Sequence, residues 1–279
     1  LSQIVLRPSN PCVIDVTHIM IKENNLKIKI KQGIPILGTW NTIGSPMFSE
    51  VLSYSGLDFL IVDFEHGPFQ IDQVHDYVNR CENNSCTPIF RIPSNSDWMA
   101  LQVLDQGGHG VMAPHIDDKD SAQLLVDSTK YHPNGKRGFT PFTKAGGFTN
   151  LHGDVYAEKA NEFTLVSIIV ESKEALENLD EILEVDEIDV VYFGAYDLSQ
   201  ALGVPGETRH TSVLREIEHG LRKVNDNGKY AGGFVAQSKD DIKWLLDMGM
   251  RFITYEVDSS IVYKAVNEVT DWFGNELKK

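Results

Sequence analysis

The chain has 279 residues, of which 42% are hydrophobic and 23% are charged. This composition is typical of a globular protein and excludes a disordered, fibrous or membrane chain. Its 25 Lys and Arg residues against 40 Asp and Glu residues give a net charge of −15, which argues against nucleic acid or an anionic membrane as partner. No apolar run approaches the roughly 18 residues of a transmembrane helix, and a secretory signal pattern is missing, so we expect a cytoplasmic protein.

The first 25 residues differ from the rest of the sequence. They carry Pro8 and Pro11 and show no sustained hydrophobic period. We interpret residues 1–25 as an N-terminal arm that precedes a domain spanning residues 26–279.

Beyond this arm, short apolar runs recur between turn residues. There are eight, at residues 35–40, 58–64, 87–92, 110–115, 163–171, 189–193, 230–235 and 252–257. Each is too short for a helix, rich in Val, Ile and Phe, and apolar on both faces. This pattern predicts strands of a parallel sheet that is covered on both sides.

Helical patterns lie between the strands. Ser238 begins one that ends at Gly249, Ser172 begins one that reaches residue 183, and a third is expected over residues 121–131. The only long gap between strands contains a Gly-rich stretch at residues 133–153, and a loop of that length is usually functional. Eight alternating units without a linker predict an α/β fold, a single-domain (β/α)8 TIM barrel, over an open doubly wound sheet.

In such barrels the active site lies at the C-terminal ends of the strands. The residues that follow the first six predicted strands there are mostly ionisable: Trp40, Glu65 and His66, Arg91, His115, Glu171 and Asp197. Their coincidence at one end of the barrel predicts a catalytic mouth.

Glu171 and Asp197 each have two interpretations. Either could simply begin a helix, Glu171 in its first turn and Asp197 as its N-cap. Two carboxylates from adjacent strand ends, with no His or Cys cluster beside them, are also the ligands that Mg2+ or Mn2+ prefers. Zinc is disfavoured.

The basic residues also leave alternatives open. His66 is either a structural group or a general base that Asp63 orients. Arg91 emerges from an apolar strand and needs an anionic partner, which is a protein carboxylate or a substrate. Arg137 is either an anion-binding residue or part of a solvated turn. No lysine stands at a strand end, so a Schiff-base mechanism has only the loop residue Lys144 as a candidate.

Several motifs together resemble one known family, the HpcH/HpaI-type aldolases of the phosphoenolpyruvate/pyruvate-binding barrel superfamily. The motifs are GTW at residues 38–40, LIVDFEHGP at 60–68, FRIPS at 90–94, YHPNGKRG at 131–138, VES at 170–172 and FGAYDLS at 193–199. The resemblance runs from about residue 33 to residue 258.

This resemblance implies a metal-dependent class II aldolase that works through the enolate of a pyruvate-type 2-oxo acid. Glu171 and Asp197 would hold the divalent ion (Mg2+ or Mn2+, with Co2+ as a further option), Arg91 would neutralise the oxo acid, and His66 with Asp63 would relay a proton on the aldehyde side. Trp40, Ala195, Tyr196 and Arg137 would contact the substrate, and Asp105 and His115 would support the site, Asp105 often across a subunit boundary. The family pattern also implies a homo-oligomer, a hexamer or trimer of dimers, with an exchanged C-terminal helix at residues 259–277.

The chain departs from the family pattern inside the expected pocket. Ile169 stands where Gln is usual, His115 where Met is common and Glu256 where Gly is common, and Ala195 and Tyr196 replace the usual Pro and a small residue. We therefore expect lyase chemistry with an altered substrate. Two alternatives remain: a condensing transferase that joins an enolate to a carbonyl acceptor in a biosynthetic pathway, and a ligand-binding barrel without turnover.

Overall fold

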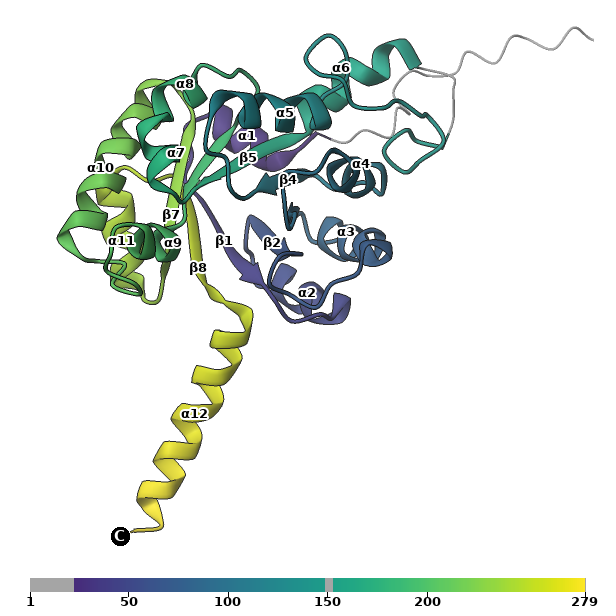
Figure 1. Cartoon of the computed structure of the whole chain (residues 1–279). Helices are drawn as coiled ribbons and strands as arrows, with labels where there is room; N and C mark the ends of the chain where they lie inside the picture. Colours follow the sequence, from purple (N-terminus) through teal and green to yellow (C-terminus); the bar gives the residue numbers. More distant parts are fainter. Residues whose placement is uncertain (1–22, 149–152, 279) are drawn as a thin grey trace, which may run out of the picture.

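The computed structural model describes residues 23–148 and 153–278 (Figure 1). Most of the expected arm, residues 1–22, lies outside the described residues. Asn24 is buried, and its side chain accepts a hydrogen bond from the amide of Leu26 at the start of the first helix. The chain is thus already part of the folded body at residue 24.

The strands form a closed parallel barrel in chain order. They are β1 (Ile36–Asn41), β2 (Phe59–Asp63), β3 (Thr87–Arg91), β4 (Gly110–Ala113), β5 (Leu165–Val170), β6 (Val190–Phe193), β7 (Tyr230–Ala236) and β8 (Phe252–Val257). The expected TIM barrel is confirmed, and each strand begins and ends within two residues of its predicted bounds.

The helices surround this barrel, except for α12 at the C-terminus (Figure 1). They are α1 (Asn25–Lys31), α2 (Pro46–Ser53), the 3-10 helix η2 (Ile71–Gln73), α3 (Val74–Glu82), α4 (Asp97–Asp105), α5 (Lys119–Thr129), α6 (Gly153–Phe163), α7 (Lys173–Glu177), α8 (Leu179–Leu183), α9 (Ala195–Ala201), α10 (Thr211–Asp226), α11 (Lys239–Met248) and α12 (Asp258–Glu276). None of the helices in this part of the chain has both the length and the apolar character needed to span a bilayer.

Two helical predictions need correction. The helix expected from Ser172 to residue 183 is two short helices, because Asn178 leaves the helical conformation and its side chain instead donates to the backbone oxygen of Asp117. Helix α6 was not predicted, because it begins at the end of the Gly-rich stretch, which was interpreted as a loop.

Two apolar layers hold the barrel together. The interior is filled by large side chains from the strands and from α1, including Leu26, Phe59 and Phe252. The rings of Phe59 and Phe252 are stacked, with 4.2 Å between their centroids. A larger cluster lies between the strands and the outer helices. The interior side chains fill the barrel below its C-terminal end, and a cavity opens at that end.

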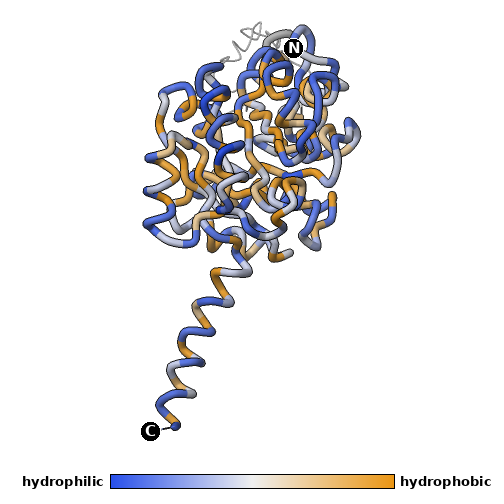
Figure 2. Tube along the Cα trace, turned by 60° about the vertical axis from the view of Figure 1, so that its left-hand side comes forward, coloured by the Kyte–Doolittle hydropathy of each residue, from blue (hydrophilic) through white to orange (hydrophobic). Residues whose placement is uncertain are grey.

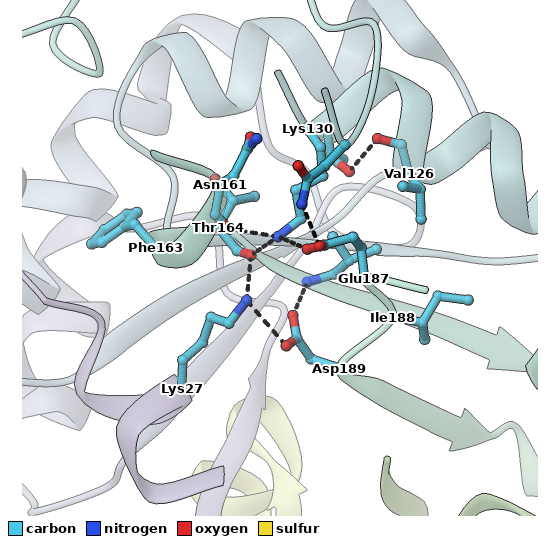
Figure 3. Close-up of polar contacts among 12 residues, drawn as sticks. Lys27, Val126, Lys130, Asn161, Phe163, Thr164, Glu187, Ile188 and Asp189 are labelled. Atoms are coloured by element: carbon cyan, nitrogen blue, oxygen red, sulfur yellow. Dashed lines mark hydrogen bonds and ion pairs between the residues drawn. The ribbon is translucent and has the colours of Figure 1, made fainter. Parts of the chain in front are cut away.

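A buried ionic cluster closes the opposite, N-terminal end (Figure 3). Lys130 donates to the backbone oxygens of Asn161 and Thr164 at 2.7 and 2.8 Å and pairs with Glu187 at 3.1 Å, and Lys27 of α1 pairs with Asp189 at 3.1 Å. Burial lowers the pKa of Lys130 to about 8. The cluster joins α1, the end of α6 and the start of β6 at the face opposite the mouth.

The C-terminal helix α12 projects away from the barrel (Figure 1). Its exposed large apolar residues are Val262, Tyr263, Val266, Val269, Trp272 and Phe273. Figure 2 shows apolar and polar residues alternating along this helix. A 19-residue helix with this much exposed apolar surface is unusual for a helix that contacts only water.

Candidate active site

A cavity of about 440 Å3 opens at the C-terminal ends of the strands. It is lined by Trp40, Thr42, Asp63, His66, Arg91, Ile169, Glu171, Tyr192, Gly194, Ala195, Tyr196, Asp197, Phe234, Val235 and Val257. We call this cavity the mouth. The structure therefore brings together eight of the residues predicted from the sequence.

Arg91 is held by a carboxylate of the neighbouring strand. The sheet register pairs Asp63 of β2 with Arg91 of β3, and the Arg91 Nε and Nη2 donate to the two Asp63 oxygens at 2.8 and 2.5 Å. Arg91 Nη1 lies 3.1 Å from Glu65 Oε2, and the guanidinium lies 4.6 Å above the Trp40 ring. These contacts fix a nearly buried guanidinium at the mouth, as bidentate pairs do.

His66 lies exposed at the rim, just beyond β2. Its backbone amide donates to Asp63 Oδ1 at 3.2 Å, beside that of Glu65 at 3.1 Å. Asp63 therefore contacts His66 through the main chain, while its carboxylate is engaged by Arg91. The sequence prediction had paired Asp63 with the imidazole, and the register of β2 and β3 explains the difference.

Glu171 is almost buried at the end of β5, with its side chain 7% exposed. Its Oε1 accepts the backbone N–H of His115 at 2.8 Å and lies 3.0 Å from His115 Nδ1. Burial raises the pKa of Glu171, as do the nearby charges of Asp197 and Glu65, while His115 opposes this rise. Carboxylates that raise the pKa of a neighbour in this way are stabilised by a cation placed between them.

Neither carboxylate of the expected pair caps a helix. Ser172 is the N-cap of α7, and Gly194 is the N-cap of α9, so Asp197 lies in the first turn of α9 and Glu171 lies before α7. Among the described residues, no three His, Cys, Asp or Glu side chains converge as a metal site. A cation here would have two protein carboxylates, with its other ligands from substrate and water.

The floor of the mouth contains a residue that the sequence analysis missed. Tyr192 lies in the barrel interior, where its hydroxyl oxygen accepts the Trp40 Nε1 proton at 3.4 Å and lies 2.9 Å from Thr254 Oγ1. The Tyr192 hydroxyl also donates to the backbone oxygen of Phe234 at 3.1 Å. The alternation of the strand at residues 189–193 was the available signal, because it turns Tyr192 to the same side as Val190.

Three further candidates lie away from the mouth of their own chain. Asp105 ends α4 just before β4, so it lies at the N-terminal end of the barrel. It pairs there with Arg137 at 2.6 Å, and the Arg137 side chain is only 2% exposed, which excludes both a solvated turn and a contact with substrate in the same mouth. Lys144 pairs with Glu82 at 3.0 Å and lines a separate small cavity, so it is not a Schiff-base candidate at the mouth.

The structure shows where the residues that depart from the family pattern lie and what they contact. His115 contacts Glu171, as described, and its side chain is 65% exposed. The buried carboxylate of Glu256 pairs with Lys264 of α12. Tyr196 is 59% exposed at the edge of the mouth, and Ile169 and Ala195 form part of its apolar wall.

Sequence comparison gives consistent matches. A family model described as HpcH/HpaI aldolase/citrate lyase matches residues 37–265. The hydroxypyruvate/pyruvate aldolase of Roseobacter denitrificans is 32% identical over 240 residues, which cover 86% of this chain and 93% of the relative. The 2-keto-3-deoxy-L-rhamnonate aldolase of Escherichia coli is 32% identical over 246 residues, which cover 88% of this chain and 91% of the relative.

Solved structures agree with these relatives. An HpcH/HpaI aldolase from Desulfitobacterium hafniense superimposes with a TM-score of 0.84 at 26% identity, covering 89% of this chain and 96% of that one. The citrate synthase SbnG superimposes with a TM-score of 0.82 at 27% identity, covering 92% of this chain and 100% of that one.

Proposed function

The chain belongs to the HpcH/HpaI aldolase/citrate lyase family and is a carbon–carbon lyase of the aldolase type, and from that premise we propose how its mouth works. The reaction forms or cleaves a C–C bond next to the enolate of a pyruvate-type 2-oxo acid. The observation that carries this proposal is the convergence of Glu171, Asp197, Arg91 and His66 on one cavity.

Glu171 and Asp197 are the residues that would hold a divalent cation. Two carboxylates completed by water suit Mg2+ or Mn2+, which keep several waters when bound to proteins, and Co2+ accepts the same oxygen ligands. Glu171 Oε1 is engaged by His115, whereas Oε2 lies beside Gly194 on the wall of the mouth. A bound cation supplies Lewis-acid stabilisation of the negative charge that develops on the oxo acid.

The protein side chains perform the remaining steps. Arg91 binds the carboxylate of the 2-oxo acid, because its guanidinium is already oriented by Asp63 and Trp40. In the cleavage direction, His66 takes the proton from the hydroxyl next to the scissile bond, and the C–C bond breaks. The electron pair of the broken C–C bond forms the enolate, an aldehyde leaves, and the enolate carbon takes a proton from solvent.

The direct test is pyruvate release from a 4-hydroxy-2-oxo acid in the presence of Mg2+ or Mn2+. We expect EDTA to abolish release and His66→Asn to lower kcat at least about 100-fold, which is typical of a lost general base. His219→Asn, at an exposed histidine of α10, is the matched control and should retain activity. Full activity of His66→Asn would contradict the role of His66.

A second function is favoured by the similarity to a citrate synthase structure. In a condensing transferase the enolate of an acyl thioester would join the keto carbon of a 2-oxo acid, and hydrolysis of the thioester would release the free thiol. Incubation of oxaloacetate with an acyl thioester, beside pyruvate with an aldehyde, separates the two functions, because only the transferase releases free thiol.

We also propose that the protein is a homo-oligomer in which α12 packs on another copy. The exposed apolar residues of α12 need a partner, and α2 with its C-cap residue offers an exposed apolar stripe of Met47, Val51 and Tyr54 at helical spacing. A hexamer built as a trimer of dimers would also let Asp105 serve the mouth of a neighbouring copy. Light scattering should give a smaller assembly for Trp272→Glu than for the wild type.

A further inference from the structure

The floor of the mouth is apolar beneath the space between Arg91 and Glu171. It is formed by Trp40, Tyr192 and Ile169, which belong to one buried cluster of the barrel interior and line the mouth. We propose that Ile169 selects a 2-oxo acid donor that carries an apolar group on C3, the carbon next to the oxo group, and disfavours a donor with a hydroxyl group there. This inference rests on the proposed aldolase function and names the class of its donor.

The three floor residues connect the two ends of the donor site. The Arg91 guanidinium lies 4.6 Å above the Trp40 ring, and the Trp40 and Tyr192 rings meet edge to face with 5.6 Å between their centroids. The sheet register pairs Tyr192 of β6 with Ile169 of β5. Glu171 comes two residues after Ile169, and alternate residues of a strand point to the same side. A 2-oxo acid that reaches from Arg91 to Glu171 therefore rests on this floor.

The polar groups of the floor already have partners. Trp40 Nε1 donates to the Tyr192 hydroxyl oxygen at 3.4 Å, and the Tyr192 hydroxyl donates to the backbone oxygen of Phe234 at 3.1 Å. Ile169 carries no polar atom. A C3 hydroxyl group resting on these three described side chains would lose its water without gaining a hydrogen bond, which is unfavourable, whereas a methyl group would gain apolar contact.

Ile169 also borders the oxygen that would face the cation. A Cβ added at Gly194 would lie 3.3 Å from Ile169 Cγ2 and 3.0 Å from Glu171 Oε2, so both atoms lie close to one point of the wall. The family pattern has Gln where this chain has Ile169, and an amide there would offer a donor and an acceptor. The departure thus changes the chemistry beside the donor and leaves Glu171 in place.

The apolar surface continues up the wall of the mouth. Val235 and Val257 line the mouth and pack against the same interior cluster as Ile169. The cavity volume of about 440 Å3 falls within the usual range of ligand pockets, so it leaves room for a donor one carbon longer than pyruvate.

The reaction of such a donor is that of pyruvate with one more substituent. The donor loses one C3 proton and forms the enolate, the enolate carbon bonds to the aldehyde carbon, and the aldehyde oxygen takes a proton. The product is a 4-hydroxy-2-oxo acid with an alkyl group on C3.

The test measures the exchange of C3 protons for deuterium in D2O by proton NMR, with Mg2+ present. The donors are pyruvate, 2-oxobutanoate and 3-hydroxypyruvate, and the last two are of similar size and differ by a methyl or a hydroxyl group on C3. Exchange rates without enzyme correct for the different intrinsic acidities of the two donors. We expect the corrected kcat/KM of the wild type to be at least about tenfold higher for 2-oxobutanoate than for 3-hydroxypyruvate, as for a hydroxyl group left without a partner.

Variants of Ile169 assign this preference to the side chain. Ile169→Gln and Ile169→Thr each place a polar group on the floor, so the corrected ratio should fall about tenfold. Ile169→Leu keeps the floor apolar and should keep the preference. Ile34→Gln is the matched control, because it makes the same change at an isoleucine that is 42% exposed just before β1, at the opposite end of the barrel. Both donors are measured on one preparation, so the ratio does not depend on the fraction of folded enzyme.

The outcomes separate this inference from the proposed function. If the wild type exchanges pyruvate but has no corrected preference for 2-oxobutanoate, the inference is wrong while the aldolase function stands. It is also wrong if neither Ile169→Gln nor Ile169→Thr lowers the ratio. If the wild type exchanges none of the three donors with any divalent cation, the proposed function fails first and this inference falls with it.

Discussion

Gly194 lies against the carboxylate that would hold the cation, and Gly194→Ala tests that arrangement. A Cβ added at residue 194 would lie 2.8 Å from Glu171 Cβ, 3.0 Å from Glu171 Oε2 and 3.3 Å from Ile169 Cγ2. Carbon atoms in ordinary contact are about 3.5–4.0 Å apart, so the Glu171 side chain must shift by on the order of 1 Å.

This shift should weaken cation binding more than folding. Displacing a group that orients a metal ligand costs about 10- to 100-fold in metal affinity, and overpacking costs about 1–3 kcal/mol of unfolding free energy. The assay is titration with Mn2+ followed by electron paramagnetic resonance, beside a thermal melt. Gly274→Ala is the matched control, because a Cβ at that position of α12 meets no atom within 4 Å. Wild-type Mn2+ affinity in Gly194→Ala would refute the placement of Glu171 as a ligand.

Three further predictions concern the ionic network of the fold. Asp63→Asn removes the charge that orients Arg91, so the KM for pyruvate should rise at least about tenfold in steady-state kinetics, and an unchanged KM would contradict the orienting role. Burial alone would raise the pKa of Glu82, but the hydrogen bonds and charges of His109 and Lys144 outweigh burial and lower that pKa to about 2. The resulting stability, roughly 3 kcal/mol, is present above the ordinary value of about 4.5 and is lost as the pH falls toward 2. The unfolding free energies of the wild type and of Glu82→Gln should therefore converge as the pH falls from about 4.5 toward 2, and a constant difference between them would contradict this role of Glu82. Lys130→Met removes the ammonium that pairs with Glu187 and donates to the backbone oxygens of Asn161 and Thr164, although Asn134 still donates to Glu187 and Lys27 to Thr164. Urea unfolding should show a loss of about 3 kcal/mol, whereas equal stability would show that the cluster contributes nothing.

The barrel could be predicted because each strand is apolar on both faces and is bounded by turn residues. This pattern is typical of a covered parallel strand, and the residues that directly follow such a strand lie at the C-terminal end of the barrel. For this reason Trp40, Glu171 and Asp197 were expected at one mouth, and the structure brings them there. Helix α6 was missed because its start lies in a Gly-rich stretch, which favours the prediction of a loop.

The partners of the site residues could not be predicted in the same way. Asp63 is three residues from His66 in sequence, yet its carboxylate pairs with Arg91, because strand register and not sequence distance decides which side chains face each other. The pairing of Asp105 with Arg137 joins a helix end to a long loop, and no periodicity specifies how such a loop folds. The register shift in β7 between Gly232 and Val235 likewise has no signal in the sequence.

The central claim is that the mouth makes the enolate of a 2-oxo acid with a cation held by Glu171 and Asp197. Proton NMR of pyruvate in D2O measures this step alone, without an aldehyde. With Mg2+ or Mn2+ present, the account predicts that the wild type exchanges the methyl protons for deuterium, that EDTA stops the exchange, and that Glu171→Gln slows it at least about 100-fold. Exchange at the wild-type rate in Glu171→Gln, or no exchange with any divalent cation, would contradict the account.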